Sequence, residues 1–197
     1  GDRRARYVTT MRSVLAFLLA CLVAVAAAGA DYQRKPLAFR HEDFGARELG
    51  ELRDRYDFDE YVARGKTELE RMILLQDWVY RKVAYGGATK YVDLRNSLTI
   101  LEKASQGVEM WCNNMAAVFM QCAASLGWTA RYVFLRSPQG DAHVSNDIWS
   151  NELRKWIMPD VNWNLHLERA GEVLSIAAVR SSEARGVGDE CRSRWLR

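Results

Sequence analysis

Three residue types used in thiol chemistry follow one another in the order cysteine, histidine, aspartate, at Cys112, His143 and Asp160. A thiolate can attack a carbonyl carbon, and an imidazole can carry the proton that the leaving amine needs. A carboxylate beside the imidazole fixes its tautomer and orientation. Together the three groups suit acyl transfer through a thioester, a reaction that needs no metal.

The cysteine is expected at the start of a helix. Gly107 breaks the chain before it, Gly127 ends the pattern, and the apolar residues between them fall on one helical face: Met115, Val118, Phe119, Cys122 and Leu126. The free amides at a helix N-terminus favour an anion, which biases a thiol at Cys112 toward the thiolate. Cys122 lies in the middle of the apolar face and is interpreted as a core residue.

A hairpin is expected to bring the histidine and the aspartate together. The segments "HVSNDIW" and "RKWIMPD" flank the turn-like "SNEL", and the strand "TARYVFLR", ending near Arg136, precedes them. A turn centred on Asn151 and Glu152 places His143 directly opposite Asp160, with Cβ atoms about 4.5 to 5.5 Å apart. A slip by one residue would separate them. Asp147 is expected to pair diagonally with Arg154.

Further helices are predicted before the cysteine. One spans "TELERMILLQDWVYRKVAY", where Thr67 and Glu70 form a capping pair, and a shorter one spans "SLTILEKA", with Ser97 as its cap. Because strands follow helices without regular alternation, the predicted fold class is α+β.

The ordered motifs resemble the transglutaminase-like superfamily. They are "WCNNMAAVFMQCAASLGWTARYVFL", "HVSNDIWSNELRKW" and "WIMPDVNW", after the lead-in helix "QDWVYRKVAY", and the resemblance covers about residues 67–175. It implies a papain-like core in which the cysteine helix packs on an antiparallel sheet. It also implies Cys112 as the nucleophile, His143 as general base and acid, and Asp160 as the orienting carboxylate. Met110 stands where that family usually has glycine.

The implied activity is that of a cysteine protease, an amidase or an acyltransferase. Its substrate would be a peptide bond or a glutamine carboxamide, with hydrolysis or transfer after the thioester. A peptide or protein substrate, including a cell-wall peptide, is the expected partner. The alternatives are a non-catalytic module that binds peptide or cell-wall fragments on the same fold, and a degenerate copy without function. His166 is the rival to His143 as base, whereas His41 is interpreted as a surface residue.

The first 30 residues are typical of an export signal. Four arginines precede the apolar run 13–29, which ends in small residues, so cleavage is expected before Asp31 and the protein is expected in the periplasm or outside the cell. A retained anchor at 13–29 or lipidation at Cys21 is the alternative. The segments that follow are interpreted as a lead-in (31–66), a transglutaminase-like domain (67–179) and a polar tail (180–197).

Composition excludes several other classes. The 197-residue chain carries 28 basic and 25 acidic side chains, and the expected leader holds four of the former and one of the latter, which leaves a neutral mature chain. No basic stripe with interleaved aromatics indicates nucleic-acid binding. Zinc-ligand spacings such as CxxC or HxxxH are absent, so no cofactor is expected. Cys112 and Cys122 would lie about 15 Å apart on one helix, which is too far for a disulfide.

Overall fold

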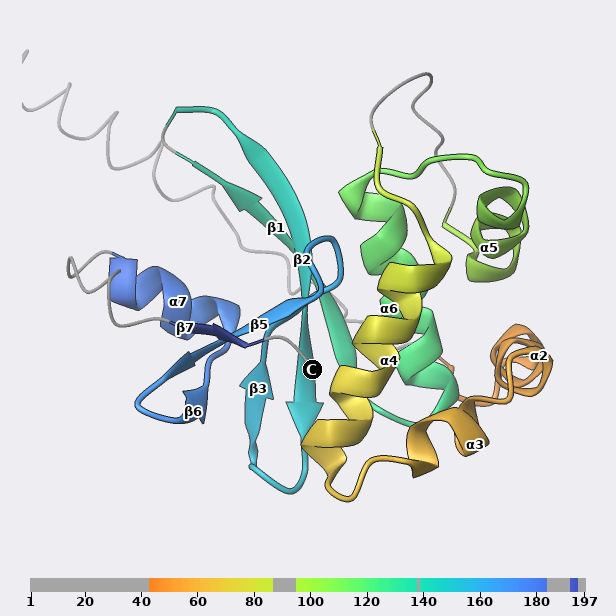
Figure 1. Ribbon diagram of the computed structural model, residues 1–197, viewed down its shortest axis with the longest axis horizontal. Coiled ribbons are helices and arrows are strands. Elements are labelled where there is room, and N and C mark those ends of the chain that lie inside the picture. The colour runs from red at the N-terminus through yellow and green to blue at the C-terminus, as the bar shows by residue number, and fades with distance from the viewer. Residues whose placement is uncertain (1–42, 87–94, 138, 184–191, 195–197) are drawn as a thin grey trace, which may run out of the picture. The chain divides into compact units, whose positions relative to one another are not determined.

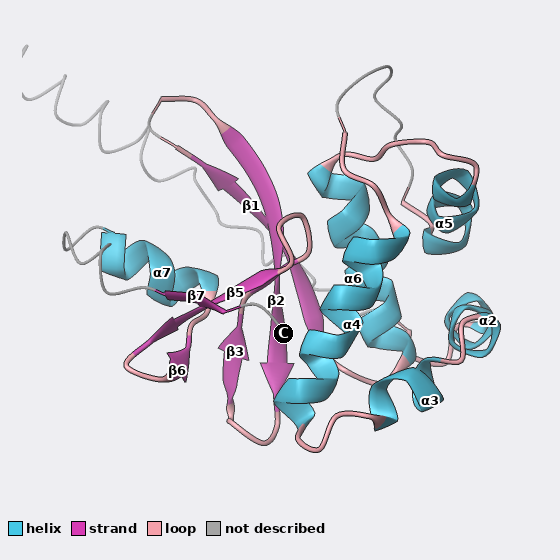
Figure 2. Ribbon diagram, in the orientation of Figure 1, coloured by secondary structure: helices cyan, strands magenta, loops and turns pink. Residues whose placement is uncertain are grey.

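A computed structural model describes residues 43–86, 95–137, 139–183 and 192–194. Within these ranges the helices are α2 (Arg47–Arg55), α3 (Phe58–Ala63), α4 (Glu68–Lys82), α5 (Ser97–Ser105), α6 (Cys112–Ser125) and α7 (Ile176–Glu183). The strands are β1 (Ala130–Arg136), β2 (Ala142–Ser150), β3 (Lys155–Ile157), β4 (Pro159–Asp160), β5 (Leu165–Arg169), β6 (Glu172–Val173) and β7 (Arg192–Arg194). The α+β fold class is confirmed (Figures 1 and 2).

Some predicted features lie outside the described residues: the export signal at 1–30, Cys21 and His41. The described helices include none that is both long and apolar enough to cross a membrane.

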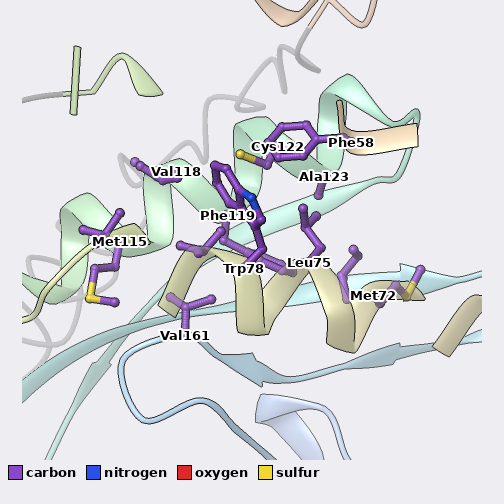
Figure 3. Packing of buried hydrophobic residues seen from close by; sticks show 14 of the residues in the cluster. Phe58, Met72, Leu75, Trp78, Met115, Val118, Phe119, Cys122, Ala123 and Val161 are labelled. Carbon is purple, nitrogen blue, oxygen red and sulfur yellow. The ribbon is translucent and has the colours of Figure 1, made fainter. Parts of the chain in front are cut away.

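The main core forms where α3, α4 and α6 meet (Figure 3). Phe119 of α6 is fully buried, and Phe58 of α3 packs edge-on against Trp78 of α4 with ring centroids 4.8 Å apart. Edge-to-face packing of this kind adds to the energy of apolar burial. Cys122 lies in this core and is fully buried, as its place on the apolar face predicted.

The cysteine helix packs on an antiparallel sheet, as predicted. The sheet has the order β1-β2-β3, and α6 is held to its central strand where the Asn146 amide donates to the Ala116 carbonyl at 3.1 Å. A second antiparallel group joins β4, β5 and β6, with β7 also paired to β5. In Figure 2, α4 and α6 lie to one side of β2, while α7 and the second strand group lie to the other.

The start of α5 differs from the prediction. Asn96, not Ser97, is the N-cap, since its side-chain oxygen accepts the Thr99 N–H at 3.1 Å. Ser97 is buried and donates its hydroxyl to the Ala117 carbonyl at 3.4 Å. Its burial against α6 explains why a residue type common at caps lies inside the helix. The segment interpreted as a tail also holds the end of α7 and the strand β7.

The hairpin tip between β2 and β3 is tied to the start of α4 by Glu68. The Glu68 carboxylate accepts hydrogen bonds from the Ser150 hydroxyl at 2.7 Å, the Asn151 amide at 3.2 Å and the Glu152 N–H at 2.8 Å. Burial raises the pKa of Glu68, but these hydrogen bonds outweigh it and hold the pKa below its ordinary value. The charged carboxylate therefore stabilises this junction.

We predict that Glu68→Gln lowers the free energy of unfolding by about 1 to 2 kcal/mol at pH 7, because charge-assisted hydrogen bonds are lost. A group whose folded pKa is depressed contributes stability above its unfolded pKa and loses it as the pH falls through the folded value. The difference in the free energy of unfolding between wild type and Glu68→Gln should therefore shrink below about pH 4. Urea unfolding at several pH values measures it, with the exposed Glu60→Gln in α3 as control. A deficit that is constant with pH would contradict the assignment.

Candidate active site

Cys112 is the first residue of α6, as predicted. Trp111 caps the helix, and its N–H donates to the Asn114 side chain at 3.3 Å. The Cys112 side chain is partly exposed, in contrast to the buried Cys122, whose pKa is raised well above its ordinary value by burial. Of these two described cysteines, Cys112 is therefore the one whose thiol solvent can reach.

His143 and Asp160 lie in direct contact. His143 Nε2 is 2.7 Å from Asp160 Oδ2, and Asp160 is only 3% exposed. The second oxygen, Oδ1, accepts the Asn162 N–H at 3.0 Å. With Nε2 donating to the carboxylate, the ring's other nitrogen, Nδ1, is left to accept a proton. This is the arrangement that an imidazole base requires.

Trp163 covers one face of the imidazole. The two ring centroids are 4.7 Å apart with planes tilted by 35°. Trp163 itself is half exposed, so it screens the His143 ring while remaining part of the surface. The sequence analysis did not single out Trp163, and its position three residues after Asp160 is the signal that could have done so.

The predicted hairpin register was wrong. The observed pairs are Ile148 with Ile157, Trp149 with Trp156 and Ser150 with Lys155, which places a four-residue turn between the strands. Arg154 in that turn has a φ of 53°, and Glu68 holds the turn's other end. The register is shifted by two residues, which preserves the face on which each side chain lies. His143 and Asp160 therefore still meet, although they are not cross-strand partners and Asp160 pairs with Leu165 of β5.

The predicted partner of Asp147 was also wrong. Asp147 is fully buried, and its Oδ2 accepts from Arg131 Nη2 at 2.6 Å and Nε at 3.1 Å. Its Oδ1 accepts the N–H of Ile176, the first residue of α7, at 2.9 Å. Arg131 lies directly opposite Asp147 in the β1–β2 ladder. Pairing these strands about the "SPQGD" turn would have found this ion pair in the sequence.

His166, the predicted rival base, has a different partner. It is paired with Pro159 across β4 and β5, so its side chain lies on the opposite face of the strands from that of Asp160. Its Nε2 is 3.1 Å from Glu168 Oε1. Asp160 is thus engaged by His143 and not by His166.

A cavity of about 440 Å³ lies beside His143 and is also lined by Tyr85, Trp163 and α7. The backbone of Tyr85 bridges to Met110, since the Met110 N–H donates to Ala84 at 2.8 Å and the Gly86 N–H donates to Met110 at 3.1 Å. The loop that leads into Cys112 is therefore paired, through Met110, with the segment that contributes Tyr85 to the cavity lining.

The thiol itself is not hydrogen-bonded to the imidazole. Within the described ranges, no hydrogen bond joins Cys112 Sγ to His143. Asn146, which contacts α6, lies on the opposite face of β2 from His143. The structure thus brings His143 and Asp160 together and places Cys112 at the neighbouring helix end. The described residues also contain no group of three His, Cys, Asp or Glu side chains that could hold a metal ion.

Comparisons with known proteins were made for the sequence and the fold. The sequence profile of the transglutaminase-like superfamily matches residues 57–163, just over half of the chain. The search of curated proteins finds no match. The chain resembles the solved structure of a presumed cysteine protease from Cytophaga hutchinsonii, with 14% identity, a TM-score of 0.47, and coverage of 77% of this chain and 49% of that one. It also resembles a solved structure described as a TGase, with 13% identity, a TM-score of 0.46, and coverage of 82% and 42%. The chain spans less than half of either solved structure.

The His143–Asp160 contact predicts a protected ring proton. In wild type, the hydrogen-bonded Nε2–H of His143 should exchange slowly with water and give a far-downfield proton NMR signal, assigned by ¹⁵N labelling of histidine. Asp160→Ala should abolish this signal, while Asp160→Asn should keep a weaker one because an amide oxygen also accepts a hydrogen bond. The matched control is Glu168→Gln, which changes the carboxylate beside His166 and leaves Asp160 in place. An unchanged His143 signal in Asp160→Ala would disprove the contact.

Proposed function

The chain belongs to the transglutaminase-like superfamily, and from this premise we propose that it is a thiol enzyme that breaks an amide bond through a thioester. The observation that carries the proposal is the 2.7 Å contact between His143 Nε2 and the buried Asp160, which leaves Nδ1 as the nitrogen able to carry a proton beside a cavity. Cys112, at the N-terminus of α6, is the proposed nucleophile.

The proposed reaction has two halves. In the first, the Cys112 sulfur bonds to the carbonyl carbon of a peptide or glutamine carboxamide, and His143 passes its Nδ1 proton to the amine as the carbon–nitrogen bond breaks. In the second, water or an amine attacks the thioester carbon. His143 takes the proton of that attacking group, and the Cys112 thiolate leaves. Asp160 keeps the imidazole in one tautomer throughout and stabilises its protonated form.

The second candidate function is a module that binds peptides without catalysis. It is favoured by the lack of a hydrogen bond, within the described ranges, between Cys112 Sγ and His143, and by Met110, which is buried where the family usually has glycine. Exposed aromatic side chains at Tyr85 and Trp163 line the cavity and suit contact with a peptide. The two functions differ in whether Cys112 is activated.

Alkylation of Cys112 by iodoacetamide near pH 7 separates the two candidates. For an enzyme, we expect Cys112 to react on the order of tenfold or more faster in wild type than in His143→Ala, because the imidazole promotes the reactive thiolate. Incubation with glutamine-containing peptides should also leave an acyl group on Cys112, seen by mass spectrometry. The buried Cys122 should stay unmodified in the folded protein. Slow alkylation that is indifferent to His143→Ala would support the binding module.

Export is also part of the proposal. The four arginines and the apolar run 13–29 that follows them support it. We predict that protein recovered from the periplasm or the culture medium of an expressing cell begins at Asp31, as N-terminal sequencing would establish. Recovery of the intact leader in the cytoplasmic fraction alone would contradict export.

A further inference from the structure

The cavity beside His143 carries two arginines from different elements. Arg136 is the last residue of β1, and Arg180 lies on α7. Both side chains are exposed, and within the described ranges neither forms an ion pair or a hydrogen bond. Both guanidinium groups can therefore bind a ligand without first losing a partner among the described residues.

Asp141, the acidic side chain among the described residues that line this cavity, already accepts a hydrogen bond. Its Oδ2 accepts from the Ser137 hydroxyl at 3.2 Å, within the turn that joins β1 to β2. Asp160 lies behind His143 and is bonded to it. With Tyr85 as the other titratable group of the lining, the cavity has more positive than negative charge.

Arg180 is held in place by the fold. Asp147 is fully buried, it is paired with Arg131, and it accepts the Ile176 N–H at the start of α7. Ile176 and Arg180 are four residues apart on this helix, so they share the face that lines the cavity. The buried Asp147 carboxylate thus fixes the start of the helix that presents Arg180. The rest of that face is apolar, since Ile176 and Val179 also line the cavity.

We propose that this cavity selects peptides with a carboxylate close to the amide that reacts at Cys112. The inference rests on the proposed function and adds the substrate class to it. A guanidinium fork matches a carboxylate through two parallel hydrogen bonds, which an uncharged amide cannot reproduce. Arg136 and Arg180 are the specificity-determining residues, and the apolar face of α7 holds the side chains beside the carboxylate.

Paired peptide probes test this selectivity. A set of tetrapeptide acyloxymethyl ketones is made in which one position at a time holds either glutamate or its neutral isostere glutamine. The ketone alkylates a reactive thiol, so the rate of labelling at Cys112 of the full chain, followed by mass spectrometry, reports binding next to the nucleophile. At each position the labelling rate with glutamate is divided by the rate with glutamine. This ratio cancels any difference between variants in the reactivity of the Cys112 thiol itself.

We expect the glutamate probe to react faster at one position or more. Arg136→Glu and Arg180→Glu should each lower that ratio by roughly two- to fivefold, the effect of an exposed ion pair. High salt should lower it as well, because charges are screened. The matched control is Arg47→Glu on α2, which is exposed and lies outside the cavity and should leave the ratio unchanged.

Equal rates for glutamate and glutamine at every position would overturn the inference while the proposed function stands, provided that labelling still depends on His143. A glutamate preference that survives both arginine substitutions would overturn it too, because the selectivity would then arise elsewhere. If His143→Ala leaves labelling by every probe unchanged, the proposed function itself fails and the substrate class fails with it.

Discussion

The burial of β2 on both faces is the constraint on which the rest of the structure depends. Ser145, Asn146 and Asp147 are polar and fully buried, so each requires a hydrogen-bond partner inside the protein. Asn146 donates to α6 on one face, while Asp147 accepts the first N–H of α7 on the other. One strand therefore fixes both helices that border the candidate site.

Both ends of β2 are also held by side-chain contacts, and the first end carries His143. His143 lies at its start and contacts Asp160, and Ser145 donates to the Pro159 carbonyl at 3.5 Å, one residue before Asp160. At its other end, the hairpin tip is bonded to Glu68 of α4. Because polar contacts hold the strand along its length, the position of the imidazole is set by the layers of the fold and not by a loop.

Local patterns in the sequence predict the positions of the helices and strands well, but they predict the register between paired strands less well. Apolar spacing located α4 and α6, and β-branched and aromatic residues located β1. The β2–β3 register was missed because it depends on a four-residue turn, and Arg154 in a left-handed conformation is not a turn signal that sequence offers. The His143–Asp160 contact was nevertheless anticipated, since a shift by two residues leaves side chains on the same face.

The partners of the charged side chains were predicted less well than the helices and strands. Arg154 is nearer to Asp147 in the chain than Arg131 is, yet Arg131 is the partner because β1 is the directly adjacent strand. The Arg131 guanidinium also stacks on Trp156 at 4.2 Å, so β3 contributes to the same ion pair. The spacing of Asp147 and Arg154 alone therefore indicated the wrong partner, whereas the pairing of β1 with β2 gives the observed one.

The imidazole and the thiol of the candidate site are held in place by separate parts of the structure. His143 and Asp160 are fixed by a direct bond, and Trp163 stacks on the ring, so their geometry is independent of the cysteine. Cys112 depends instead on the backbone bridge between Tyr85 and Met110, where a side chain at Gly86 would overlap Glu109. Thiol and imidazole are thus positioned by different contacts. For the proposed reaction to occur, the loop before α6 must bring the sulfur within hydrogen-bond reach of Nδ1, because the imidazole has little freedom to move toward it.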